Sequence, residues 1–230
     1  MPKSPATFSP ALFRFLKVLA ANNNRDWFQA NKSAYERDVL EPSLAFVEGF
    51  APALKKVSPH FLAEPRRMGG SLMRIYRDTR FAKDKSPYKT NVGIQFRHEM
   101  GKNVHAPGFY VHLQPGSCYL GVGLWHPEPA ALAKIRAAID ENRSQWKRAR
   151  DDKRFGAEFR LAGDSLSKAP RDYPKDHPLI EDLKRKDFIA VKQLAEKDVL
   201  APSFAAGLAK SFAAARPLMR FLCTAIVLPF

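Results

Sequence analysis

Four short stretches between residues 71 and 124 decide the fold: SLMRIY (71–76), NVGIQF (91–96), FYVHL (109–113) and CYLGVGL (118–124). Apolar side chains alternate with polar or small ones along them, which is typical of β-strands with one buried face. The last two stretches flank QPGS (114–117), a composition that predicts a hairpin turn. Because no helical spacer lies between the stretches, we predict one largely antiparallel sheet with strands at 71–76, 92–97, 109–114 and 118–124.

Helical patterns precede the predicted sheet. Ser9 and Pro10 suit the cap and the first turn of a helix, because proline lacks the N–H that would have no partner there. Asn24 is expected to cap a second helix. Pro42 is expected to kink or break that second helix, after which helical spacing of apolar residues resumes.

Helical patterns also follow the sheet. A helix is expected to begin at Pro127 or Pro129, and helices at 196–213 and 217–226 are expected near the end of the chain. Residues 188–194 fit either a short strand or a short helix.

These patterns predict an α+β fold in which a central, mostly antiparallel sheet of at least four strands is covered by N- and C-terminal helices. No linker of flexible composition divides the chain. We therefore expect residues 1–230 to form a single domain.

Composition indicates a soluble, cytoplasmic protein. Apolar residues make up 45% of the chain and charged residues 27%, an ordinary globular balance. The two cysteines, Cys118 and Cys223, form no CxxC pair, which favours a reducing compartment. No run approaches the roughly 18 apolar residues that a membrane-spanning helix needs. No His, Cys or Asp cluster has metal-ligand spacing and no cofactor motif is present, so we expect neither metal nor cofactor.

The charge of the chain is strongly positive and unevenly distributed. The formal net charge is +15, and residues 66–89 hold 8 basic and 2 acidic residues. Such a surface attracts polyanions, phosphorylated metabolites or anionic lipid. A simple contribution to solubility is the alternative explanation.

The long connection between the first two predicted strands is the strongest candidate for a functional site. Long ordered loops in compact domains are disproportionately functional, and this one is rich in cations. Arginine offers a planar fork for phosphate or carboxylate, and lysine offers a mobile point charge. We predict an anion-binding concavity over residues 74–91, with Arg77, Arg80 and Lys85 as the main contacts. The full set of candidate ligand-binding residues is Arg74, Arg77, Arg80, Lys83, Lys85, Tyr88, Lys89 and Asn31.

Two other functions compete with anion binding. Asp78 and Asp84 lie among the cations, so the loop is alternatively a salt-bridged brace in a structural or adaptor protein. The second alternative is an enzyme that acts on an anionic substrate, with Asp78, Asp84 or His112 as general acid or base. A buried, hydrogen-bonded histidine is the alternative role for His112.

Three motifs resemble a known family. They are Asn24-Arg25-Asp26-Trp27-Phe28 with Asn31, Lys32 and Tyr35; Arg77-Asp78-Thr79-Arg80-Phe81 with Lys83 to Lys89; and Pro107 to His112 with Gly121-Val122-Gly123-Leu124-Trp125. Together they resemble an uncharacterised conserved family of bacteria and fungi, over roughly residues 8–222. The resemblance implies no catalytic role, only that these positions belong together.

Two expectations concern the relation between these motifs and the ligand. We expect Asn31 or Tyr35 to point toward the basic loop, with a solvated helical position as the alternative for Asn31. The expected partner is a phosphorylated small molecule or a nucleic acid. No pattern in the sequence specifies an oligomeric state.

Overall fold

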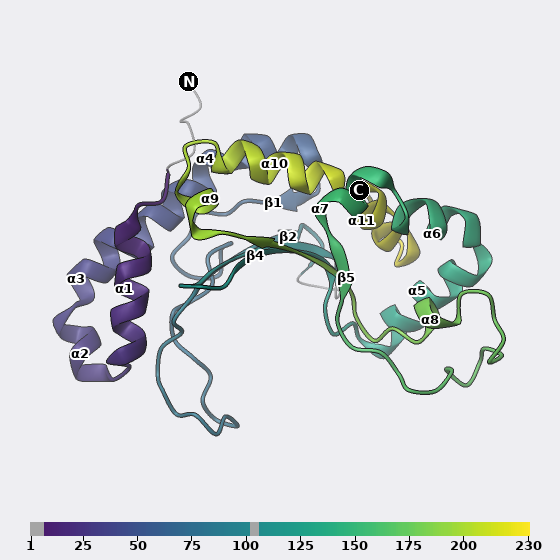
Figure 1. The fold of residues 1–230 in the computed structure, drawn as a ribbon, viewed down its shortest axis with the longest axis horizontal. Coiled ribbons are helices and arrows are strands. Elements are labelled where there is room, and N and C mark those ends of the chain that lie inside the picture. The colour runs from purple at the N-terminus through teal and green to yellow at the C-terminus, as the bar shows by residue number, and fades with distance from the viewer. Residues whose placement is uncertain (1–6, 102–105) are drawn as a thin grey trace.

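A computed structural model describes residues 7–101 and 106–230. Its centre is a six-stranded sheet in the order β1-β2-β3-β4-β6-β5 (Figure 1). Every neighbouring pair is antiparallel. The strands are β1 (Phe61–Leu62), β2 (Val92–His98), β3 (Gly108–Leu113), β4 (Cys118–Leu124), β5 (Arg160–Ala162) and β6 (Phe188–Leu194). The α+β class and the antiparallel sheet predicted from the sequence are confirmed, and residues 188–194 are a strand.

The prediction of a strand at 71–76 is wrong for most of its length. Only isolated bridges form there, Leu72 with Ile94 and Tyr76 with Tyr88. Met73 N–H donates to the Gly93 carbonyl at 2.9 Å, but the chain then leaves β2. Its backbone groups next pair with residues 87–89 of the loop itself, so the alternation does not continue along the sheet.

The N-terminal helices are α1 (Pro10–Ala21), α2 (Arg25–Ala30), α3 (Lys32–Tyr35), a π-helical turn η1 (Glu36–Leu40) and α4 (Glu41–Val57). Pro42 lies in the first turn of α4, where its missing N–H costs nothing. The expected kink is therefore replaced by the π turn just before it, which lets the helical path continue.

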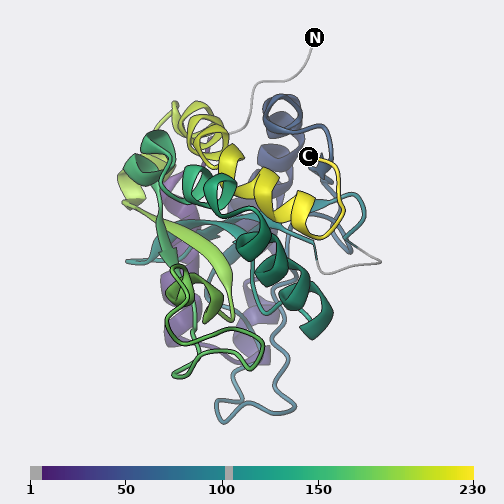
Figure 2. The same ribbon diagram turned by 90° about the vertical axis from the view of Figure 1, so that its right-hand side faces the viewer.

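The C-terminal helices are α5 (Pro129–Glu141), α6 (Arg143–Arg150), α7 (Lys153–Glu158), α8 (Ile180–Leu183), α9 (Glu196–Leu200), α10 (Phe204–Ala214) and α11 (Arg216–Ala225). Helices α4, α10 and α11 lie on the same face of the sheet, so both ends of the chain cover it (Figures 1 and 2). No helix in the described ranges is long and apolar enough to cross a membrane.

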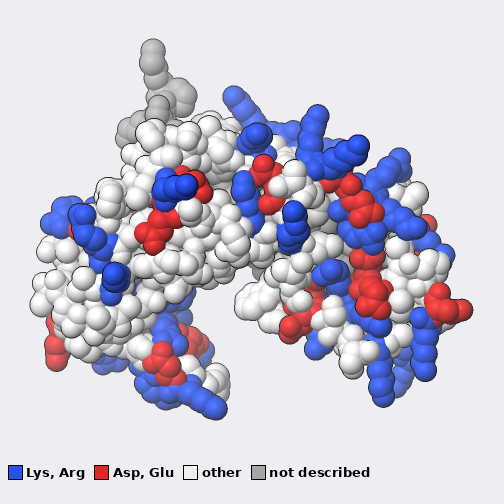
Figure 3. Space-filling view, viewed as in Figure 1, with Lys and Arg blue, Asp and Glu red and all other residues white. Residues whose placement is uncertain are grey.

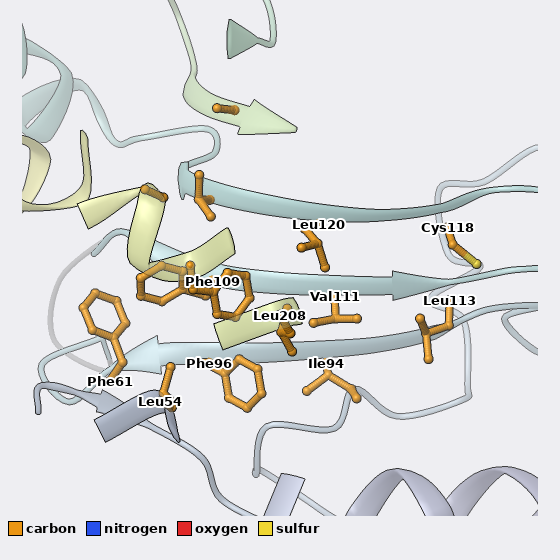
Figure 4. Packing of buried hydrophobic residues seen from close by; sticks show 14 of the residues in the cluster. Leu54, Phe61, Ile94, Phe96, Phe109, Val111, Leu113, Cys118, Leu120 and Leu208 are labelled. Atoms are coloured by element: carbon orange, nitrogen blue, oxygen red, sulfur yellow. The ribbon is translucent and has the colours of Figure 1, made fainter. Parts of the chain in front are cut away.

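The core lies between these helices and one face of the sheet. Val92, Ile94 and Phe96 point into it from β2 and are almost fully buried. Phe109 on β3 packs against Phe212 of α10, with 4.6 Å between the ring centroids (Figure 4). Because side chains alternate along a strand, the residues between these positions point to the opposite face, which the described helices leave open.

Removing the Phe109 ring tests the importance of this core. Phe109→Ala should lower the free energy of unfolding by about 3–5 kcal/mol, because it leaves a cavity among buried rings. Urea denaturation measures this change. Val18→Ala is the control, since Val18 is 46% exposed and its truncation should change stability by less than about 0.5 kcal/mol. Equal effects in the two variants would contradict the packing described.

Candidate functional site

The basic loop, residues 74–91, begins and ends in a short neck, in which the backbone of residues 75–77 pairs with that of residues 87–89. Arg77 N–H donates to the Pro87 carbonyl at 2.9 Å, and Lys89 N–H donates to the Ile75 carbonyl at 2.7 Å. Tyr76 and Tyr88 face each other across this neck, with ring centroids 5.5 Å apart. The loop is therefore held at both ends, and its tip hangs below the sheet (Figure 1).

Asn23 and Phe28 fasten the neck to the N-terminal helices. The buried Tyr88 ring stacks on Phe28, with centroids 4.0 Å apart. The Asn23 side chain accepts from Tyr88 N–H at 3.1 Å and donates to the Tyr88 carbonyl at 2.9 Å. The first two sequence motifs thus meet in space. Asn23 was missed in the sequence, because its neighbours Asn22 and Asn24 explain the asparagine run as helix-end signals.

The two polar positions expected beside the loop behave differently. Asn24 caps α2 as predicted, accepting from Trp27 N–H at 2.9 Å. Asn31 instead donates to the Trp27 carbonyl at 2.9 Å, a bond to the helix that it ends, which is the alternative given for this residue. Tyr35 does face the neck: burial, followed by the nearby Tyr76, raises the pKa of Tyr35 to about 12.

Local carboxylates neutralise two of the arginines in the loop. Asp78 accepts from Arg80 Nε at 3.0 Å and from Nη2 at 2.6 Å. Asp84 accepts from Arg77 and from Ser86, and Arg77 Nη1 also donates to Ser86 Oγ at 3.1 Å. These pairs are the interactions that the brace hypothesis expects.

The pKa values of the two carboxyl groups reflect these bonds. Hydrogen bonds from Arg80 lower the pKa of Asp78 to about 2. Hydrogen bonds from Ser86 and then Arg77 hold the pKa of Asp84 well below its usual range. Both groups are ionised at neutral pH and weakly basic, which makes them poorly suited to general acid or base chemistry.

The other cations of the loop lack such partners. Among the described residues, no carboxylate forms an ion pair with Arg74, Lys83, Lys85 or Lys89; Lys85 Nζ donates to the Thr79 carbonyl at 2.9 Å. Burial, and then the positive charge of Arg74, lower the pKa of Lys89. Arg74 and Lys89 therefore repel each other at the neck, and the described carboxylate whose pKa the charge of Arg74 lowers, Asp78, is bonded to Arg80.

A small concavity of about 560 Å³ lies where the loop meets the turn between α1 and α2. Its lining residues are Asn23, Asn24, Arg25, Thr79, Lys85, Ser86 and Pro87. Lys85 lines it, whereas Arg77 and Arg80, its predicted partners in an anion site, do not.

The open face of the sheet lies above the hollow on the underside of the molecule (Figures 1 and 3). In Figure 3 the molecule is an arch, and basic and acidic side chains cluster at the lower end of its left lobe. The strand register arranges this face in three rows across β2, β3, β4 and β6. The rows are Gly93-His112-Tyr119-Gln193, Gln95-Tyr110-Gly121-Val191 and Arg97-Gly108-Gly123-Ile189.

His112 is the centre of a polar network on this face. Its Nδ1 accepts from the Tyr110 hydroxyl at 3.0 Å and lies 3.5 Å from the Asn91 amide, while Nε2–H donates to Gln114 Oε1 at 3.0 Å. Its ring stacks on Tyr119, with centroids 4.5 Å apart. Partial burial lowers the pKa of His112, so the ring is neutral at neutral pH. Asn91 ends the basic loop, so this network joins the loop to the sheet.

Part of this network is visible in the alternation of the sequence. Tyr110, His112 and Gln114 are spaced by two residues, which places them on one face of a strand. The place of Tyr119 beside His112 depends on the register between β3 and β4, which cannot be predicted from the sequence. No group of three or more His, Cys, Asp or Glu residues that suits a metal ion occurs within 7–101 and 106–230.

The chain belongs to the family described as Conserved hypothetical protein (DUF2461), whose model matches residues 11–221. The family resemblance drawn from the motifs is confirmed. No curated protein and no solved structure matches the chain.

The two hydrogen bonds between the Asn23 side chain and the Tyr88 backbone, here called the Asn23 clamp, can be tested by mutation. Asn23→Ala should lower the free energy of unfolding by about 1–3 kcal/mol, because it leaves partly buried backbone groups of Tyr88 without partners. Hydrogen exchange at the Tyr88 amide should speed up as well. Asn22→Ala is the matched control, since that side chain donates to Val18 within its own helix. A Tyr88 amide equally protected in both variants would count against the clamp.

The protonation of His112 gives a second test. Since its folded pKa lies below the ordinary 6.5, the unfolded chain binds a proton more tightly, and stability should fall as pH drops through 6.5. Imidazole ¹⁵N NMR should show the neutral Nε2–H tautomer at neutral pH. A titration midpoint above 6.5 would refute the network.

Proposed function

We propose that the protein binds an anionic, phosphate-bearing ligand, a phosphorylated small molecule or a nucleic acid, where the basic loop meets the open face of the sheet. The observation that carries the proposal is the pair Arg74 and Lys89, whose charges act on each other and which form no direct ion pair with a carboxylate of the described residues. An anion between them would replace repulsion by attraction. The Asn23 clamp and the stacked Tyr88 hold the neck before a ligand arrives, which lowers the cost of ordering the site.

The loop cations divide into two groups in this proposal. Arg77 and Arg80 shape the loop through Asp84 and Asp78, whereas Arg74, Lys83, Lys85 and Lys89 supply charge to the ligand. Lys85 contributes from the concavity beside Asn23. The ion pairs therefore support a brace and a site in the same segment.

An enzymatic role is the second candidate, and the His112 network favours it. Neutral His112 accepts from the Tyr110 hydroxyl, whose pKa burial raises. The raised pKa keeps the proton on Tyr110, so His112 would act as a general base on a substrate hydroxyl or water that replaces the Tyr110 hydroxyl at Nδ1. A hydrolase assay on phosphomonoesters separates this role from binding: His112→Gln would abolish turnover and leave phosphate affinity intact.

We also place the protein in the cytoplasm. Cys118 and Cys223 are buried free thiols, and burial raises the pKa of the Cys223 thiol to about 12. Such thiols fit a compartment in which disulfides do not form.

Charge removal at the neck tests anion binding. Calorimetric titration with inorganic phosphate and pyrophosphate should show saturable binding, and Arg74→Ala or Lys89→Ala should weaken it about tenfold, the loss of one charge-assisted contact. Lys55→Ala on α4 is the control, because it removes the same charge from an exposed position on the covered side of the sheet.

Two outcomes would contradict the proposal. One is an equal loss of affinity in Lys55→Ala, which would mean that only net charge matters. The other is a parent protein that binds neither anion while Arg77→Ala with Arg80→Ala lowers its stability, which would make the loop a brace alone.

A further inference from the structure

Trp125 is displayed on the surface by an unusual turn at the end of β4. It follows Leu124, the buried last residue of that strand, and 66% of its own surface is exposed. The next residue, His126, has φ +47°, a left-handed conformation that residues other than glycine adopt uncommonly. The two rings stack, with centroids 4.2 Å apart. His126 thus supports the indole, while most of the indole stays in contact with water.

A buried carboxylate holds this turn in place. Asp187 is 1% exposed, and its Oδ1 accepts from His126 N–H at 2.8 Å and lies 3.2 Å from His126 Nδ1. Its Oδ2 accepts from Asp164 N–H at 2.9 Å. These bonds fix both the backbone and the imidazole of His126. An uncommon backbone conformation that is held so firmly, and that leaves a large aromatic ring in water, indicates a binding function for the ring.

Trp125 and the loop cations lie at opposite ends of the open face. Asn91 ends the basic loop beside His112, and the register pairs His112 with Tyr119 near the start of β4. Trp125 follows the other end of β4, where the sheet meets the lobe that contains α5 (Figure 1). The chain from Tyr119 to Trp125 spans roughly 20 Å. A phosphate ion or a mononucleotide therefore reaches only one end of this surface.

A further cation and further rings lie between the two ends. Arg97 is exposed in the last row of the open face, and its Nε donates to Gln95 Oε1 at 3.2 Å. None of the described carboxylates forms an ion pair with Arg97, since the neighbouring Glu99 binds His60. Nearer the loop, the partly exposed Tyr119 ring stacks on His112. Cations that follow phosphates and rings that stack on bases are the two components of single-stranded nucleic acid sites.

We propose that a single strand of nucleic acid lies along the open face, with its phosphates on the loop cations and Arg97 and with one base stacked on Trp125. This inference rests on the proposed function and names its ligand. Charge favours it, because the formal net charge of +15 attracts a polyanion. Length favours it as well, because strands of about 4–16 nucleotides fill such sites. A duplex keeps its base faces in its own stack and offers none to Trp125.

The first experiment measures anisotropy of a fluorescein-labelled oligothymidylate of about 10 nucleotides. Trp125→Leu keeps an apolar side chain without the ring and should weaken binding about tenfold, the loss of one stacked base. Trp125→Phe keeps a ring and should lose less than about threefold. Pyrophosphate affinity should change by less than about twofold in both variants. Their melting temperatures should stay within about 2 °C of the parent, because the side chain is exposed.

Tryptophan fluorescence reports the contact directly. Of the three tryptophans, Trp27 is partly buried and Trp146 is fully buried, so Trp125 is the one that a base can reach. Unlabelled oligothymidylate should quench the fluorescence of the parent protein. The quenching should vanish in Trp125→Phe although binding persists, and it should remain in the matched control Trp27→Phe.

Four results would overturn the inference while pyrophosphate binding upholds the anion site. They are an oligonucleotide affinity that is unchanged in Trp125→Leu, a parent protein that does not bind the oligonucleotide, AMP that binds as tightly as the oligonucleotide, and a duplex with oligoadenylate that binds as tightly as the single strand. A parent protein that binds neither pyrophosphate nor the oligonucleotide overturns the proposed function as well.

Discussion

Four phenylalanine rings, Phe50, Phe96, Phe109 and Phe212, join α4 and α10 to β2 and β3, with the closest centroids 4.6 Å apart. This contact fixes which face of the sheet is buried. A shift of one residue in register would exchange the faces and bring Tyr110 and His112 into the core, where their polar atoms would lose water. The polar and glycine-rich composition of the open face is therefore a consequence of where these rings pack.

The second constraint is electrostatic and local. Asp78 and Asp84 neutralise Arg80 and Arg77, each within the turn that both partners share. Ion pairs as exposed as Arg80 with Asp78 contribute little to global stability, so their main effect is on the shape of the loop tip. Anchoring comes from the neck, where Asn23, Phe28 and Tyr88 meet in partly buried surroundings. The ion pairs shape the loop tip and the neck contacts hold the loop ends, so that Arg74 and Lys89 lie beside the sheet.

The sequence predicted the parts of the fold that depend on local periodicity. Three of the four expected strands follow from alternation along β2, β3 and β4, and Asn24 follows from helix-capping chemistry. The segment 71–76 failed because a strand needs a partner, and beyond Met73 the chain pairs with its own loop. Which cation would pair with which carboxylate depends on the path of the loop, so the ion pairs of Arg77 with Asp84 and Arg80 with Asp78 could not be assigned from the sequence. The role of Asn23 could not be predicted from the sequence, because its partner is the backbone of a residue 65 positions away.

A brace and the proposed binding site do not exclude each other. A loop with six cations and two carboxylates cannot hold a defined shape if all of its charges repel, and a loop with every charge paired offers nothing to an anion. Here the pairing is partial and ordered in space. Arg77 and Arg80 are neutralised in the tip, whereas Arg74 and Lys89 at the neck, next to Asn91 and the His112 network, form no ion pair with a described carboxylate. The proposed anion site requires this division, with ion pairs that shape the tip and cations at the neck that are open to an anion.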